Sequence, residues 1–156
     1  MVNLLPNSGE QYRKKLLSGS IAPPTSYFVG LIDSNTDTID ETTDVADLES
    51  EPDDGNYQRL QYDLGTATLG ETLNANNDWQ LVMNEQTFDL VNTTGGYVDH
   101  GVVVVTYQAD GESSENDHAF FFVELTDAQG NPTQIDLEGT KEATFSATLT
   151  DVEPSG

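Results

Sequence analysis

An all-β fold is the class that this sequence predicts: an antiparallel β-sandwich of jelly-roll type, with about eight strands and a short N-terminal helical arm. After residue 24 the chain consists of short β-rich runs separated by explicit turn residues. Strands and helices do not alternate along the chain, which argues against a parallel sheet. Short strands joined by such turns are typical of jelly rolls. An immunoglobulin-like sandwich without its usual cysteine pair is the alternative.

The N-terminal arm is predicted over residues 1–24, with a helix over residues 8–17. Ser8 is a suitable N-cap residue, and Gln11 lies three residues later, as in a capping box. Gly19 can end the helix because glycine adopts the left-handed conformation of a C-terminal cap at little cost. The Pro-Pro pair that follows cannot continue a helix and predicts an extended strap.

The sandwich is predicted over residues 25–151, with a flexible tail over residues 152–156. Its first strand, residues 27–32, is apolar enough to be buried on both faces, and Gly30 within it indicates a bulge or a close backbone approach. The other predicted strands end at turns rich in Gly, Asn and Asp. They cover residues 57–64, 66–69, 79–83, 87–91, 97–108, 119–126, 133–137 and 143–151.

Residues 33–54 form the acidic loop, a segment with many acids, several threonines and no aromatic residue. A segment of this composition has too few apolar side chains to bury a core of its own. We therefore expect a long solvated loop on an outer surface, in which residues 45–48 form one helical turn.

The chain of 156 residues carries 28 Asp and Glu residues against five Lys and Arg residues, a net charge of -23. Self-repulsion of this size is tolerable mainly where salt screens it, so the charge predicts a high-salt habitat. A mesophilic acidic domain is the alternative. The same charge argues against nucleic acid and membrane partners, because it repels phosphate backbones and anionic lipid heads. No apolar run approaches the roughly 20 residues of a membrane helix, and we expect a soluble protein that is not conventionally secreted.

No enzymatic site is predicted. The chain has no cysteine, which excludes thiolate nucleophiles and cysteine zinc clusters. The only histidines, His100 and His118, each follow an aspartate, but neighbouring strand residues point to opposite faces of a sheet. Neither aspartate is therefore expected to orient its histidine, and we expect both rings to be partly exposed near turns.

Asp53 and Asp54, in the turn before Gly55, are weak candidates for cation ligands, because carboxylate oxygens suit Ca²⁺ or Na⁺. The turn itself requires residues of this kind. Their spacing is not that of an EF-hand loop. No cofactor is predicted beyond loosely bound cations.

The predicted helix carries three adjacent bases together with apolar side chains. These residues form the candidate site for docking to a capsid or to another subunit: Tyr12, Arg13, Lys14, Lys15, Leu16 and Leu17. Bases concentrated at one end of so acidic a chain would orient that end toward an anionic neighbour. The apolar residues would add contacts that salt does not screen. The alternative is that the bases only compensate the helix macrodipole.

Several segments follow one another in a distinctive order. A basic helix and a proline strap precede the Y-F-V-G-L-I strand, the acidic loop and the segment Gly55-Asn56-Tyr57-Gln58-Arg59-Leu60. Phe88, residues 93–96 and residues 98–102 continue the same order. This order resembles a group of small structural proteins from tailed viruses. Many of them carry a "gYaR" type segment, then a Phe-containing strand and a turn into a long apolar strand. This chain departs from that pattern, with Asn-Tyr-Gln-Arg in place of Gly-Tyr-Ala-Arg.

The resemblance, which covers most of residues 8–105, implies a non-enzymatic virion protein of jelly-roll type that forms symmetric oligomers. The acidic composition is similar to that of viruses that infect halophilic archaea. The implied partners are the major capsid protein and copies of the chain itself. The implied location is the capsid surface, as a decoration or turret protein. A tail or head-tail connector protein of the same kind of virus is the second possibility.

A carbohydrate-binding module is a further alternative, suggested by the aromatic residues. Trp79, Tyr97 or Tyr107 could serve as stacking platforms on one face of the sandwich. The same residues lie in apolar-patterned strands, which suits packing in the core equally.

Overall fold

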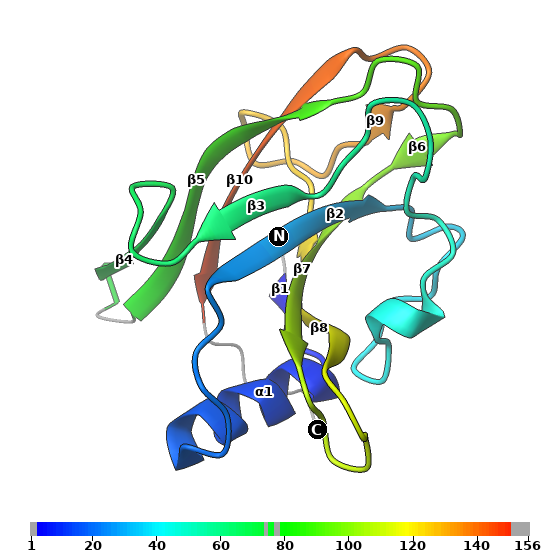
Figure 1. Cartoon of the computed structure of the whole chain (residues 1–156). Helices are drawn as coiled ribbons and strands as arrows, with labels where there is room; N and C mark the ends of the chain where they lie inside the picture. The colour runs from blue at the N-terminus through cyan, green and yellow to red at the C-terminus, as the bar shows by residue number, and fades with distance from the viewer. Residues whose placement is uncertain (1–2, 74, 77–78, 151–156) are drawn as a thin grey trace.

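The computed structural model describes residues 3–73, 75–76 and 79–150, and within them every strand pairing is antiparallel (Figure 1). The described residues contain one α-helix, α1 (Asn7–Ser18), which follows the short first strand, and a 3-10 helix, η1 (Val45–Asp47), which lies in the acidic loop. These observations confirm the all-β class, the N-terminal helix and the helical turn in the acidic loop. The described residues form ten strands rather than about eight.

The main sheet has five strands in the order β1 (Asn3–Leu4), β8 (Asn116–Glu124), β7 (His100–Tyr107), β2 (Ser26–Ile32) and β3 (Leu60–Asp63). The second sheet has three strands in the order β10 (Glu142–Thr150), β5 (Trp79–Asp89) and β4 (Leu69–Leu73). A separate pair consists of β6 (Tyr97–Val98) and β9 (Ile135–Asp136).

The strands differ from the predicted ones in several places, including the predicted strand at 66–69, which is observed as β4 over Leu69–Leu73. The predicted strands at 79–83 and 87–91 are one strand, β5, because pairing with β10 continues across the polar residues between them despite a register shift. The predicted strand at 97–108 is interrupted at Asp99. The pairing of β1 with β8 was not predicted. The predicted tail, residues 152–156, lies outside the described residues.

The centre of the main sheet is buried on both faces, which explains the uninterrupted valine run of β7. Val103 and Val105 belong to a core shared with the second sheet, whereas Val102 and Val104 face the acidic loop. The two sheets approach closely, since a Cβ on Gly101 would lie 2.8 Å from Cε2 of Phe145 in β10. The side chains that the second sheet supplies to the shared core include Met83, Phe88, Phe145, Ala147 and Leu149.

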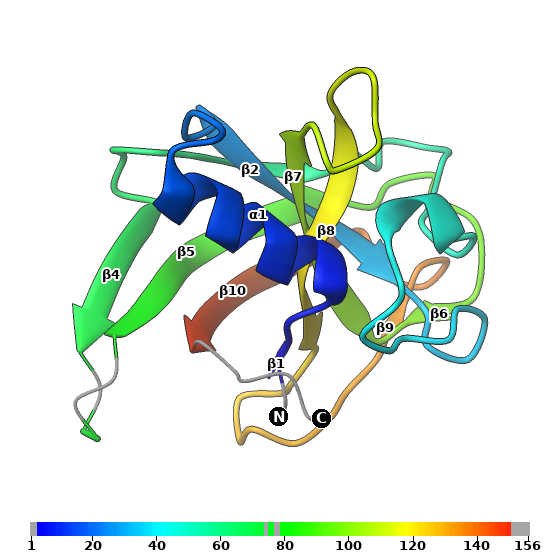
Figure 2. The same ribbon diagram turned by 90° about the horizontal axis from the view of Figure 1, so that it is seen from below.

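Helix α1 is part of the folded body and not a detached arm. It lies across one end of the two larger sheets and packs on β8 (Figures 1 and 2). Gly9 is buried so closely against the backbone carbonyl of Phe120 that a side chain could not fit there. Before the helix, Asn3 and Leu4 pair with Val123 and Phe122 of β8. The N-terminal segment therefore contributes to the core that it was expected only to adjoin.

The acidic loop covers the outer face of the main sheet, where a fully solvated loop was expected. Its apolar residues Ile39, Val45 and Leu48 pack on a cluster of buried sheet residues. That cluster consists of Ile32, Val102, Val104, Ala119 and Phe122. The loop is acidic overall, but three apolar side chains are enough to attach it to the sheet.

Candidate docking surface

Helix α1, which carries the predicted docking residues, is fixed at both ends. Pro6 precedes it in an extended conformation without a side-chain cap, and Gly19 ends it in the left-handed conformation, with φ of 75°. The N–H of Gly19 donates to the carbonyl of Leu16 at 3.1 Å, as predicted for a C-terminal glycine. Ser8 does not cap the helix. Its Oγ donates to the carbonyl of Ala119 at 2.8 Å, so this side chain ties α1 to β8.

Tyr12, one of the six predicted docking residues, lies in the core. Its hydroxyl is 2.8 Å from the hydroxyl of Tyr27, and its ring packs against Tyr107 and Phe120 with centroid distances of 5.3 and 5.0 Å. Burial, followed by the hydrogen bond with Tyr27, raises the pKa of Tyr12. Because it is fully buried, its side chain is not available to a partner in the folded protein. Leu16 is also partly packed against the core.

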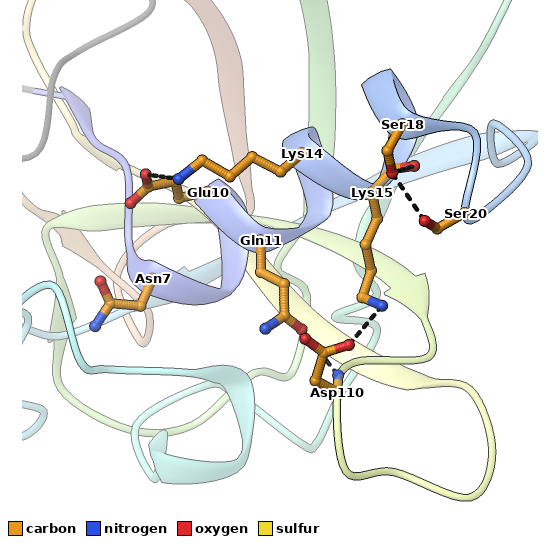
Figure 3. Close-up of a pocket in the computed structure, with 8 residues that line it drawn as sticks. All are labelled: Asn7, Glu10, Gln11, Lys14, Lys15, Ser18, Ser20 and Asp110. Atoms are coloured by element: carbon orange, nitrogen blue, oxygen red, sulfur yellow. Dashed lines mark hydrogen bonds and ion pairs between the residues drawn. The ribbon is translucent and has the colours of Figure 1, made fainter.

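Both lysines of the basic group are paired with acids of the same chain (Figure 3). Nζ of Lys14 lies 2.6 Å from Oε1 of Glu10, one helical turn away, and this hydrogen bond is the main cause of the lowered pKa of Glu10. Nζ of Lys15 lies 2.7 Å from Oδ1 of Asp110, in the turn between β7 and β8. Arg13 is half-buried on the same helix. The positive charge of this end is therefore partly compensated within the molecule.

The outer side of α1 forms an open depression of about 560 Å³ with the β7–β8 turn (Figure 3). The residues that line it are polar or charged: Asn7, Glu10, Gln11, Lys14, Lys15, Ser18, Ser20 and Asp110. Gln11 accepts a hydrogen bond from the backbone N–H of Asp110 at 3.0 Å, which holds the turn against the helix. Because every lining residue is polar or charged, the depression suits a polar or ion-pairing surface better than a small apolar ligand.

Leu17 is the apolar member of the predicted docking group that the fold leaves most open to solvent. Its exposed fraction is 83%, compared with 50% for Tyr97, 39% for Leu64 and 36% for Val91, the other exposed large hydrophobic residues in the described part of the chain. A leucine this exposed on a well-packed helix provides an apolar contact that salt does not weaken.

Asp54, a predicted weak cation ligand, joins two loops. Its carboxylate accepts from the backbone N–H of Thr94 at 3.0 Å and from the hydroxyl of the same residue. These hydrogen bonds lower the pKa of Asp54. Its neighbour Asp53 is exposed. Across residues 3–73, 75–76 and 79–150 no three His, Asp or Glu side chains are placed to hold one metal ion.

His100 is oriented by its neighbouring aspartate, contrary to expectation. Nδ1 of His100 lies 2.9 Å from Oδ1 of Asp99. Asp99 lies between β6 and β7 and belongs to neither strand, so the alternation of side chains between the two faces of a sheet does not apply to it. Ser34 donates both its N–H and its hydroxyl to the same Asp99 carboxylate. The aspartate, not the histidine, is thus central in this group, because the Ser34 hydroxyl bonds to the Asp99 carboxylate and not to the imidazole.

His118 is buried, with 7% of its surface exposed, and not partly exposed as expected. Nδ1 lies 2.6 Å from Oδ2 of Asp44 in the acidic loop, and Nε2 lies 3.0 Å from Oε2 of Glu112 in the β7–β8 turn. With both ring nitrogens in use, this histidine cannot accept a proton from a substrate in the conformation observed.

Two of the aromatic residues proposed as carbohydrate platforms differ in exposure. Tyr97 is half-exposed, whereas Tyr107 is buried and its hydroxyl donates to the carbonyl of Ser8 at 2.7 Å. The side chain of Trp79 lies outside the described residues. Of the two that are described, only Tyr97 presents a ring to solvent.

Residues 55–60, which belong to the order of segments that resembles tailed-virus proteins, make contacts that stabilise the fold. Nε and Nη2 of Arg59 each lie 2.7 Å from an oxygen of Glu51, and the Tyr57 hydroxyl donates to the same carboxylate at 3.0 Å. The side chains of Glu51 and Tyr57 crowd Gly30 of β2, where a bulge or a close backbone approach was predicted. The segment therefore fastens the end of the acidic loop to the main sheet.

Comparison of the chain with protein-family models, with curated proteins and with solved structures finds no match. No helix among the described residues has the length and apolar character needed to cross a membrane.

Proposed function

We propose that the protein is a non-enzymatic structural component of the virion of a halophilic tailed virus. In this role it is a capsid decoration or turret protein that forms symmetric oligomers on a shell of major capsid protein. We further propose that its two larger sheets form a sandwich with jelly-roll topology. The exposed end of α1, with Leu17 at its tip, contacts the shell or a neighbouring subunit.

The observation that carries the proposal is the exposure of Leu17 beside a charged but internally paired helix face. At a salt concentration of 1 M the Debye length is about 3 Å, so ion pairs between subunits are weakened. Apolar contacts between subunits persist. An assembly of strongly acidic subunits therefore depends on apolar contacts, and Leu17 is the most exposed large hydrophobic residue described. Closed cyclic symmetry is an economical arrangement for so small a subunit.

Three further observations support a structural role. The order of segments resembles that of small structural proteins from tailed viruses, and the net charge of -23 suits a surface exposed to concentrated salt. The histidines are both engaged by carboxylates of the same chain.

The experiment that tests this function is the protein composition of purified particles. Tailed-virus particles from a halophilic archaeal culture that carries the gene are separated into heads and tails and analysed by mass spectrometry. The proposal predicts many copies in the head fraction. Enrichment in the tail fraction would favour a tail or connector protein, and absence from both fractions would contradict a virion role.

A further inference from the structure

We propose that His118 is a pH-sensitive latch that holds the acidic loop on the outer face of the main sheet and releases it as the pH rises. The latch operates in the isolated protein and does not depend on the viral role proposed above.

The latch joins two segments that are distant in sequence. Asp44, the N-cap residue of η1, directs one carboxylate oxygen to Nδ1 of His118 at 2.6 Å and the other to the backbone N–H of Ala119 at 2.6 Å. On the other side of the ring, Glu112 is 3.0 Å from Nε2 and also accepts from the N–H of Ala109 at 2.9 Å. Both contacts are satisfied at once only when both ring nitrogens carry protons.

The imidazole of His118 has two carboxylates and one aromatic ring as neighbours among the described residues. Asp44 approaches from the acidic loop and Glu112 from the β7–β8 turn, while the ring of Tyr107 in β7 packs against the imidazole at a centroid distance of 4.7 Å. Asp117, the preceding residue of β8, is occupied by Thr106 and Arg59. Two carboxylates and no base therefore face His118.

The loop that the latch holds conceals apolar surface. Next to Asp44, Val45 packs with Leu48 and Ile39 on the sheet cluster that includes Ala119 and Phe122. The carboxylate of Asp37 lies inside the loop, where it accepts from the backbone N–H groups of residues 49 and 50 at 2.8 and 3.0 Å. These internal hydrogen bonds make the loop compact, and separating residues 37–48 from the sheet would expose the cluster beneath.

Protonation decides the strength of the latch. Burial by itself lowers the pKa of His118, but hydrogen bonds and charges from Asp44 and Glu112 outweigh burial and raise the pKa above its ordinary value. A raised pKa in the folded state gives stability that is fully present below the unfolded value and is lost as pH rises through the folded value. Above that pH the neutral ring donates only one hydrogen bond and turns a lone pair toward a carboxylate.

Hydrogen exchange tests the latch. Protection factors of residues 33–54, corrected for the intrinsic rate at each pH, are measured from about pH 5.5 to about pH 9 at constant KCl, together with the imidazole titration of His118 by NMR. The loop should lose protection by about tenfold for each unit by which the pKa is raised, with the same midpoint as the ring. Strands β7 and β8 should keep their protection, which separates loop release from global unfolding.

Three variants complete the test. His118→Gln should give a weakly protected loop with no pH transition, and Glu112→Gln should keep the loop closed at low pH but move the midpoint to lower pH. Glu115→Gln, which changes an exposed carboxylate of the same β7–β8 turn, is the matched control for Glu112→Gln and should behave as the wild type. A transition that survives in His118→Gln, or an unchanged midpoint in Glu112→Gln, would overturn the proposal. If His118→Gln does not fold, the midpoint of Glu112→Gln decides the question.

Discussion

The hydroxyl oxygens of Tyr12 and Tyr27 lie 2.8 Å apart in the interior of the protein, and this contact joins α1 to β2 of the main sheet. A helix tied to the core in this way cannot be removed without exposing the aromatic rings around it. The N-terminal segment therefore combines two roles, because its inner side stabilises the fold and its outer side is free to contact other molecules.

Replacing Tyr12 by alanine is expected to lower the free energy of unfolding by about 3–5 kcal/mol, because a buried ring is lost and a cavity remains. Tyr12→Phe keeps the ring but leaves the Tyr27 hydroxyl without this partner, and we expect a loss of about 1–3 kcal/mol. Urea unfolding at constant KCl measures both values. Leu17→Ala, on the exposed side of the same helix, is the control and should change stability by less than about 0.5 kcal/mol. Equal effects of Tyr12→Ala and Leu17→Ala would show that α1 is not part of the core.

Arg59→Gln is expected to loosen the C-terminal end of the acidic loop and to lower the free energy of unfolding by about 1–3 kcal/mol. The variant removes two hydrogen bonds of 2.7 Å and leaves the largely buried carboxylate of Glu51 without its cation. Lys141→Gln removes the same charge from an exposed position and should leave stability within about 0.5 kcal/mol of the wild type. Urea unfolding and hydrogen exchange of residues 48–54 measure the two effects. Equal losses in the two variants would mean that net charge matters and the Arg59 contact does not.

Leu17→Asp is expected to weaken assembly while leaving the fold intact, because it places a charge where an apolar contact is proposed. Light scattering in about 2 M KCl, where surface charges are screened, gives the mass of the particles in solution. We expect the wild type to be an oligomer and Leu17→Asp to have a lower mass. Leu64→Asp, at another exposed leucine, is the matched control and should keep the wild-type mass. If Leu17→Asp also keeps the wild-type mass, Leu17 does not lie at a contact between subunits.

Raising the salt concentration is expected to raise the thermal unfolding midpoint. At a net charge of -23 the acids repel one another, and the Debye length falls from about 10 Å at 0.1 M to about 3 Å at 1 M. Calorimetry across a KCl series measures this effect. A midpoint that is highest in dilute buffer would contradict adaptation to salt and favour the mesophilic alternative.

The sequence predicted a helix or strand well where a single local residue pattern determines it. Helix α1 was placed within one residue at each end, and the left-handed end at Gly19 followed from the special freedom of glycine. The strand β2 was likewise recognised from a run of apolar residues interrupted by one glycine, although the groups that approach this glycine, Gly30, are side chains.

Contacts between distant segments could not be read from local patterns. Asp44 and His118 are 74 residues apart, and nothing in the residues around either one indicates the other. The acidic loop looked solvated because Ile39, Val45 and Leu48 follow no regular period among its acids. Tyr12 was assigned to a docking surface because the residue pattern of an amphipathic helix shows which side chains share a face. The pattern does not show which face the sheets cover.

The measurement that tests the central claim most directly is a cryo-EM reconstruction of the purified particles. The account predicts copies of this chain arranged about a symmetry axis on the outer surface of the capsid, with Leu17 buried against the shell or a neighbouring copy and the acidic loop facing solvent. Particles without such copies, or copies in which Leu17 is open to solvent throughout, would contradict it.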